Sequence, residues 1–243
     1  MAISHRLIDT IERKQSNLTL AADTTDGDAL IALAEELGDH LCMLKTHIDM
    51  IENFTPSLPA KLQQLAKQQD FLLFEDRKFA DIGHTTYYQY TGGPYRIAQW
   101  ADLVTVHALP GPGILEAIAP ICRKQQRGVL LLIEMSSADN LLTASYRQMA
   151  LEMARPYHDI IAGVIAQSKH PMPYSWLTCT PGVKIAAGQD NMGQRYNDPK
   201  TAICENGSDV LIVGRGILAA DSPKAMAAQY QQLGWQYRQE ALR

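Results

Sequence analysis

Residues 71–81 read FLLFEDRKFAD, four apolar residues followed by a dense run of charge. The apolar part has the length and side chains of a strand that is buried on both faces, as in a parallel sheet covered by helices. The charges begin where that strand should end. Polar residues that follow parallel strands gather at the carboxyl edge of the sheet, where ligands bind. This stretch therefore predicts a parallel α/β protein with a site at the end of the strand.

Seven further apolar runs of this kind occur along the 243 residues, with helical patterns between them. The expected strands are residues 18–23, 41–45, 71–76, 103–107, 129–135, 160–166, 177–180 and 210–213. Helical patterns include residues 29–37, 58–68, 113–126, 146–157 and 223–233. A strand followed by a helix eight times favours a closed (β/α)8 TIM barrel. An open doubly wound sheet is the alternative, but no Gly-x-Gly-x-x-Gly follows the first strand.

Length and composition fit one barrel domain over residues 1–243, because single barrels routinely reach 200–250 residues. Residues 1–16 have the apolar spacing of an amphipathic N-terminal helix and lack the continuous apolar core of a signal peptide. The formal net charge is −4 without a basic run, which disfavours nucleic acid as a partner. No apolar run approaches the roughly 18 residues of a membrane span. A cytoplasmic protein without a membrane partner is expected.

The cysteines argue against a metal or disulfide framework. Cys42, Cys122, Cys179 and Cys204 are far apart, lie in apolar segments and form no Cys-x-x-Cys or Cys/His cluster. They are predicted to be buried free thiols, and no metal site is expected.

Charged residues dominate the expected strand ends. The polar residues there are Asp23, Lys45 with His47, Asp76 with Lys78 and Asp81, His107, Ser136 and Arg215. Any one of them could be a structural ion pair, and Asp76-x-Lys78-x-x-Asp81 alone is a weak pattern. Convergence favours function, because opposite charges about 4 Å apart interact by roughly 4 kcal/mol at an effective dielectric near 20. An alternating Lys/Asp array suits decarboxylation, since an ammonium can stabilise and protonate the carbanion that carbon dioxide leaves behind.

Glycine-containing segments after the last two strands predict a phosphate site. They are TPGV at 180–183, GQRY at 193–196 and VGRG at 213–216. In TIM barrels these loops commonly bind phosphate, and Arg215 could contact it in bidentate fashion. The longest polar interruption, residues 187–200, would open on the same face. The structural alternative is a barrel-closing turn whose arginine pairs with a surface acid.

Three stretches resemble the orotidine 5'-monophosphate decarboxylase family: LKTHID at 44–49, FEDRKFADIG at 74–83 and IVGRG at 212–216. The likeness runs in order from about Asn17 to Trp235. It implies decarboxylation of orotidine 5'-monophosphate to UMP, the last step of de novo pyrimidine biosynthesis, without a cofactor. It also implies a homodimer with shared active sites.

The resemblance assigns roles to individual residues. The implied catalytic network is Lys45, Asp76, Lys78 and Asp81. The implied substrate-binding residues are Asp23, Lys45, His47, Thr85, Ser136, Pro181, Gln194, Tyr196, Gly214 and Arg215. Lys78 would protonate carbon 6 of the pyrimidine, Asp76 would face the substrate carboxylate, and Asp81 would reach the neighbouring subunit's site. The chain departs from the family pattern at His84, where asparagine is usual, and in residues 136–139 and 196–198.

Two other functions stay open at this stage. A magnesium-dependent decarboxylase or synthase of sugar phosphates shares the barrel and the Asp-x-Lys-x-x-Asp pattern, but places an acid where this chain has Lys45. An ammonium there would repel a divalent cation. A catalytically silent nucleotide-binding barrel should have lost Asp76 or Lys78, and both are present.

Overall fold

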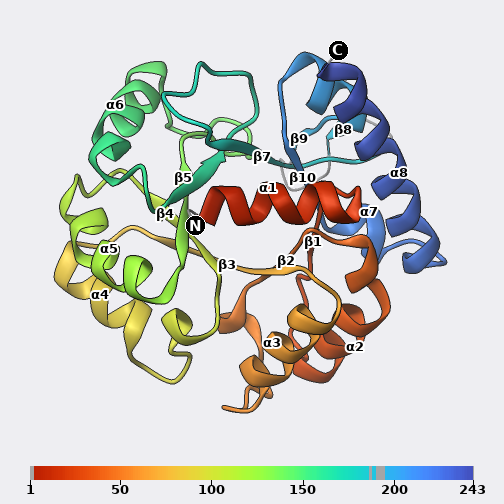
Figure 1. Cartoon of the computed structure of the whole chain (residues 1–243), viewed down its shortest axis with the longest axis horizontal. Coiled ribbons are helices and arrows are strands. Elements are labelled where there is room, and N and C mark those ends of the chain that lie inside the picture. Colours follow the sequence, from red (N-terminus) through yellow and green to blue (C-terminus); the bar gives the residue numbers. More distant parts are fainter. Residues whose placement is uncertain (1–2, 186–187, 190–194, 243) are drawn as a thin grey trace.

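The computed structural model describes residues 3–185, 188–189 and 195–242, and in it eight parallel strands close into a barrel surrounded by helices (Figure 1). The barrel strands are β1 (Leu18–Ala21), β2 (Met43–Thr46), β3 (Leu72–Phe79), β4 (Leu103–His107), β5 (Gly128–Leu132), β6 (Ile161–Ile165), β7 (Leu177–Pro181) and β10 (Val210–Val213). Their order around the barrel is β1-β10-β7-β6-β5-β4-β3-β2. The predicted TIM barrel is confirmed.

The helices pack outside this barrel, apart from α1. They are α1 (Ile3–Lys14), α2 (Gly27–Leu37), α3 (Leu58–Gln68), α4 (Gly83–Thr91), α5 (Gly113–Gln125), α6 (Ala144–Ala154), α7 (Arg215–Leu218) and α8 (Pro223–Ala241). Side-chain caps fix several starts: Asp26 accepts from the amide of Asp28 before α2, and Thr143 accepts from that of Tyr146 before α6. A two-stranded antiparallel ribbon, β8 (Gly188–Gln189) with β9 (Arg195–Tyr196), follows β7.

The expectation of a helix after every strand is wrong after β6. Residues 166–176 connect β6 to β7 without a helix. Pro171 and Pro173 lie in this connection, and each removes a backbone donor and restricts the residue before it. The seventh barrel strand is therefore reached through an irregular segment.

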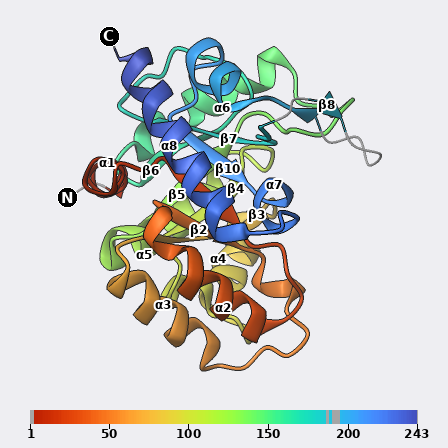
Figure 2. The ribbon, with the colours of Figure 1, turned by 90° about the vertical axis from the view of Figure 1, so that its right-hand side faces the viewer.

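Two apolar layers hold the barrel together. One lies between the strands and the outer helices, and the other fills the barrel interior. Helix α1 closes the interior layer at the amino ends of the strands, with Leu7 and Ile11 fully buried. Figure 2 shows α1 at one end of the barrel and β8 at the other. The predicted N-terminal helix thus leaves the opposite, carboxyl end open for a site.

Strand β3 extends three residues beyond its predicted end, because its pairing with β4 resumes after an irregularity. Glu75 pairs with Val104, and the next pair is Phe79 with Val106. Residues 76–78 therefore stand opposite Thr105 alone. Within this bulge Lys78 adopts a left-handed backbone conformation with φ of 50°.

The cysteine prediction is confirmed for three residues and wrong for one. Cys42, Cys122 and Cys179 are buried free thiols, but Cys204 is exposed. It lies in a short π-helical turn, Thr201–Glu205, near the surface of α8. In the described part of the chain, no helix is long and apolar enough to cross a membrane.

Candidate active site

A cavity of about 290 Å³ opens at the carboxyl ends of the barrel strands. That volume is close to the lower end of ligand pockets, roughly 300–1,000 Å³, so it suits a small molecule. Its polar and glycine lining consists of Asp23, Lys45, His47, Asp76, Lys78, Ser136, Ser137, Gly182, Tyr196, Gly214 and Arg215. Its apolar lining consists of Ala21, Phe74, Leu132, Met135, Ile165, Pro181, Val183 and Ile212. Most residues predicted for the site therefore converge.

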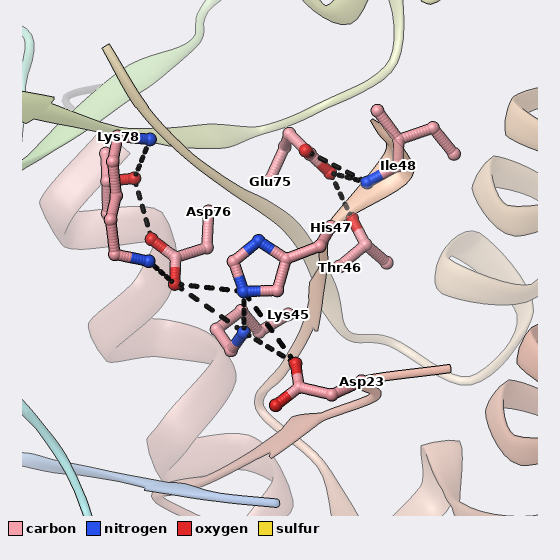
Figure 3. Close-up of polar contacts among 9 residues, drawn as sticks. Asp23, Lys45, Thr46, His47, Ile48, Glu75, Asp76 and Lys78 are labelled. Atoms are coloured by element: carbon pink, nitrogen blue, oxygen red, sulfur yellow. Dashed lines mark hydrogen bonds and ion pairs between the residues drawn. The ribbon is translucent and has the colours of Figure 1, made fainter. Parts of the chain in front are cut away.

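Lys45 is the centre of the charged array on one wall (Figure 3). Its Nζ lies 2.9 Å from Asp23 Oδ1, 2.8 Å from His47 Nε2 and 3.5 Å from Asp76 Oδ2. The Lys45 side chain is only 7% exposed. A nearly buried ammonium must be compensated, and here two carboxylates on neighbouring strands do so.

Asp76 connects this lysine to the next one. Its Oδ2 accepts a 2.6 Å hydrogen bond from Lys78 Nζ. Burial raises the pKa of the Asp76 carboxyl, but the charges of Lys45 and Lys78 outweigh burial and lower that pKa to about 2. The array therefore keeps a fixed negative charge between two ammonium groups at neutral pH.

His47 is held neutral beside Lys45. Burial lowers the pKa of His47 first, and the adjacent Lys45 charge lowers it further. Since a lysine ammonium only donates, His47 Nε2 accepts the 2.8 Å hydrogen bond, which leaves the ring proton on Nδ1. His47 is thus an orienting hydrogen-bond acceptor for Lys45.

Glu75 is a buried carboxyl that the sequence did not single out. It lies behind the array, where it accepts from Thr46 Oγ1 at 2.6 Å and from the Ile48 amide at 3.1 Å (Figure 3). Burial raises the pKa of Glu75 to about 8 despite these hydrogen bonds. The alternation of β3 could have indicated its position, because Asp76 faces the cavity and its neighbour must face the helices.

The remaining walls come from β5, β7 and β10. Ser136 follows β5, Pro181 ends β7, and Arg215 begins α7. The Arg215 guanidinium lies 5.5 Å from the centre of the Tyr196 ring. Gln194, which was predicted to contact phosphate, lies outside the described residues. The structure therefore places a cation and an aromatic ring where the phosphate loops were predicted.

Glu134 anchors the segment that carries Ser136, and no pattern in the sequence singled it out within the expected strand 129–135. It accepts from the amides of Gln167 and Ser168 at 2.6 and 3.0 Å, and it pairs with Arg147 and His170. Burial raises the pKa of Glu134, but these hydrogen bonds and the charge of His170 outweigh it and the pKa is lowered. The ends of β5 and β6 are thereby tied together.

Three residues near the predicted site do not line this cavity. Asp81 is exposed, and its Oδ1 accepts from the Ile82 amide at 2.8 Å. Thr85 lies on α4, and His84 beside it is exposed and packs edge-to-face on Tyr88. Asp81 and Thr85, both predicted for the site, therefore lie outside the cavity of their own chain.

The array differs from a metal centre in its donors. Among residues 3–185, 188–189 and 195–242, no three His, Cys, Asp or Glu side chains are grouped to hold a metal ion. Asp23 and Asp76 are bridged by the Lys45 ammonium. The arrangement can place fixed positive and negative charge against a bound ligand and offer it a proton.

Comparison with known proteins agrees with this geometry. The sequence model of the orotidine 5'-phosphate decarboxylase / HUMPS family matches residues 16–230. The chain belongs to this family. The match includes the charged array and the glycine-rich segments at 182 and 214.

Relatives within the orotidine 5'-phosphate decarboxylase / HUMPS family cover nearly the whole chain. The orotidine 5'-phosphate decarboxylase of Rhizopus oryzae is 44% identical over 96% of this chain and 89% of its own length. The uridine 5'-monophosphate synthase of Bos taurus is 42% identical over 96% of this chain. This chain spans 49% of that synthase's length, so the similarity concerns about half of the bovine protein.

Solved structures agree on the fold. Orotidine 5'-monophosphate decarboxylase from Methanocaldococcus jannaschii, complexed with the inhibitor BMP, superposes with a TM-score of 0.68 at 22% identity, over 89% of this chain and 97% of that one. Orotidine 5'-phosphate decarboxylase from Pyrococcus horikoshii gives 0.66, also at 22% identity, over 89% and 98% of the two chains. At this identity the likeness concerns the barrel alone.

Proposed function

We propose that this protein decarboxylates orotidine 5'-monophosphate to UMP, the last step of de novo pyrimidine biosynthesis, and that it needs no cofactor. The observation that carries the proposal is the Lys45–Asp76–Lys78 array in a cavity that Arg215 also lines. Family membership and the names of the relatives support it. The ammonium groups of the array can stabilise a carbanion, and the Arg215 guanidinium can bind a phosphate.

The substrate phosphate binds at Arg215, Tyr196 and Gln194 in this proposal. Arg215 and Tyr196 line the cavity, and a guanidinium can make two charge-assisted hydrogen bonds to phosphate. Asp23 and Lys45 hold the ribose hydroxyls, and Ser136 and Pro181 border the pyrimidine. Binding energy from the phosphate and ribose is then available to hold the carboxylate in an unfavourable environment.

The proposed chemical step is a proton-for-carbon dioxide exchange at carbon 6. The bond between carbon 6 and the carboxylate breaks, carbon dioxide leaves, and the electron pair remains on carbon 6. Lys78 Nζ donates its proton to that carbon and is later reprotonated from solvent. Asp76, with its lowered pKa, keeps its charge beside the substrate carboxylate and orients Lys78 through the 2.6 Å contact. Positive charge fixed in a cavity stabilises the developing carbanion without reorganisation.

Lys45 distinguishes this function from the sugar-phosphate reaction. A divalent cation bound at the end of β2 would lie against an ammonium that is 7% exposed and already bridges two carboxylates. Decarboxylation of the nucleotide uses that ammonium directly. The site therefore favours metal-independent decarboxylation of the nucleotide over the magnesium-dependent reaction of a sugar phosphate.

The direct test is release of labelled carbon dioxide from carboxyl-labelled orotidine 5'-monophosphate, with UMP formed in equal amount. We expect turnover to persist after treatment with a chelator, with added magnesium giving no gain. A folded protein that binds the nucleotide without releasing carbon dioxide would be a silent binding barrel. Loss of activity with the chelator and its return with magnesium would support the sugar-phosphate class.

We also propose that two subunits share their active sites through Asp81 and Thr85. Asp81 is exposed at the barrel mouth, outside the cavity of its own chain. Two large hydrophobic side chains that follow it in the chain are exposed, Ile82 at 65% and Tyr88 on α4 at 58%, and a partner surface would cover them. A two-fold axis would return the equivalent aspartate to this chain's cavity.

Mixing two inactive variants tests the shared site. Lys78→Ala chains and Asp81→Ala chains should form mixed dimers in which one site carries both changes and the other carries neither. Random pairing makes about half the dimers mixed, so activity should return to roughly a quarter of wild type. The matched control mixes Lys78→Ala with Lys45→Ala, whose side chains serve the same barrel, and should stay inactive. If subunits exchange and neither mixture recovers, Asp81 serves its own barrel.

A further inference from the structure

Thr105, on β4, lies opposite the bulge in β3. Its side chain is fully buried, and its hydroxyl makes two hydrogen bonds within the bulge. Thr105 Oγ1 donates to Asp76 Oδ1 at 2.8 Å and accepts from the Lys78 amide at 2.8 Å. One hydroxyl thus joins the carboxylate of Asp76 to the backbone of Lys78.

The bulge explains why this hydroxyl is needed. Three residues of β3 stand opposite Thr105, so regular ladder hydrogen bonds cannot serve all of them. The Lys78 amide is satisfied by the Thr105 side chain instead. Lys78 also has a φ of 50°, a conformation that is unfavourable for a residue with a side chain unless its surroundings enforce it.

The two hydrogen bonds close a ring that contains both charged groups. Lys78 Nζ reaches back to Asp76 Oδ2 at 2.6 Å (Figure 3). The Lys78 amide reaches Asp76 Oδ1 through the Thr105 hydroxyl. Each oxygen of the carboxylate therefore has one partner from this ring. The ring fixes the plane of the carboxylate and the direction from which the lysine side chain leaves the strand.

We propose that Thr105 is a positioning residue, whose hydroxyl holds Asp76 and Lys78 in their reactive arrangement. The proposal rests on the proposed decarboxylation for its kinetic consequence but not for its structural one. Without the hydroxyl, the Lys78 amide and Asp76 Oδ1 lose a partner together, and the left-handed conformation at Lys78 loses its support. A displacement of about 1 Å in a reacting group can lower a rate by about 100-fold.

The variant Thr105→Val removes the hydroxyl and keeps the shape of the side chain. We expect kcat to fall about 100-fold with KM changed less than about threefold, because the substrate-binding residues elsewhere in the cavity are untouched. Thr105→Ser retains the hydroxyl and should restore kcat to within a few-fold of wild type. If Thr105→Val does not fold, Thr105→Ala removes the same hydroxyl and carries the same kinetic expectation.

Thr19→Val is the matched control. Thr19 is also fully buried on a barrel strand, β1, but its Oγ1 contacts the Cys42 thiol at 3.9 Å and it does not line the cavity, so its loss should leave kcat and KM unchanged. Equal losses in Thr105→Val and Thr19→Val, or failure of Thr105→Ser to restore kcat, would overturn the positioning role. So would a Thr105→Val enzyme with kcat within threefold of wild type.

A crystal structure of Thr105→Val separates this inference from the proposed function. We expect Lys78 to leave the left-handed region and its Nζ to move away from Asp76, whatever reaction the enzyme catalyses. An unchanged Lys78 backbone in that structure would refute the role of Thr105 alone. A wild-type protein that releases no carbon dioxide from the nucleotide would instead refute the proposed function and leave the structural expectation standing.

Discussion

Two buried carboxylates at opposite ends of the barrel are each held by two cations, yet their surroundings differ. Asp76, 12% exposed, contacts Lys45 and Lys78 at the carboxyl end of the strands. Asp102, 7% exposed, contacts Arg6 and Arg127 at the amino end and also accepts from the Leu73 amide. Arginine stays charged and forms planar, bidentate contacts, whereas a lysine ammonium can give up a proton. Similar ion-pair clusters therefore suit different tasks, structure at the amino end and, in the proposed function, proton transfer at the carboxyl end.

The largest expected effect comes from removing the proton donor at the carboxyl end. Lys78→Ala should lower kcat by at least 10²- to 10⁴-fold, the usual contribution of general acid catalysis. The thermal midpoint should change little, since the Lys78 side chain is 34% exposed and Asp76 keeps Lys45. Turnover and thermal unfolding are the two measurements. An enzyme that keeps more than a tenth of wild-type activity would remove Lys78 from this role.

The corresponding change at the amino end should affect stability and spare turnover. Asp102→Ala leaves two arginines without their carboxylate and the Leu73 amide without its acceptor. Loss of one partner from a buried ion pair costs about 3–5 kcal/mol, or roughly 6–20 °C in thermal midpoint for a chain of this size. kcat at a permissive temperature should match wild type.

Asp70→Ala is the control for that experiment. Asp70 pairs with Arg13 at the same end of the barrel, but both side chains are more than half exposed. Its loss should cost at most about 1 kcal/mol. If Asp102→Ala and Asp70→Ala lower the thermal midpoint by the same small amount, burial does not distinguish the two ion pairs.

A smaller effect is expected at the phosphate side of the cavity. Arg215→Ala should weaken binding of the phosphorylated substrate by roughly 10- to 100-fold, since hydrogen bonds to charged groups contribute about 1.5–3 kcal/mol. Orotidine, which lacks the phosphate, should be processed as slowly by the variant as by the wild type. KM values for both substrates decide the matter, and equal losses on both would assign Arg215 a structural role.

The smallest effect concerns pH and the buried Glu75. Its pKa is raised to about 8, so the folded chain holds this proton between about pH 4.5 and 8 while the unfolded chain has released it. The contribution of Glu75 to the free energy of unfolding is complete below the pKa of the unfolded chain. It falls by about 1.4 kcal/mol per pH unit as the pH rises toward 8. Comparing wild type with Glu75→Gln at pH 6 and pH 7 isolates this contribution, because the other titrating groups are common to both. If the free energy of unfolding changes between pH 6 and pH 7 by the same amount in wild type and in Glu75→Gln, the pKa of Glu75 is not raised.

The sequence predicted the barrel because its strands are continuous apolar runs, whose burial on both faces leaves little choice of fold. The charged array was also predictable, since strand ends meet at one rim of a closed barrel. The bounds of helix α4 were not predicted: Thr85, Thr86, Tyr87 and Tyr88 give it no apolar period, and it packs against α5.

Other features depend on geometry that no local pattern carries. The role of Thr105 follows from a bulge in which three residues of β3 stand opposite one residue of β4. Such a register shift cannot be recognised from the composition of either strand. The position of Thr105 two residues before His107 places both on the same side of β4, and that alternation was the available signal. The proposed role of Asp81 depends on a second chain, whose position the sequence of one chain does not encode locally.

The bulge also limits how this enzyme can change over time. Pairing resumes at Phe79 with Val106, so the length of the segment between Glu75 and Phe79 is set at both ends. A one-residue insertion or deletion there would turn every later side chain of β3 to the opposite face of the sheet. Single substitutions in this segment keep the register of β3, whereas a change in its length would place Phe79 in the cavity and a charge in the core. We therefore expect variation in length to occur in the loops that follow the strands, and engineered libraries should place insertions there, for example in residues 138–142.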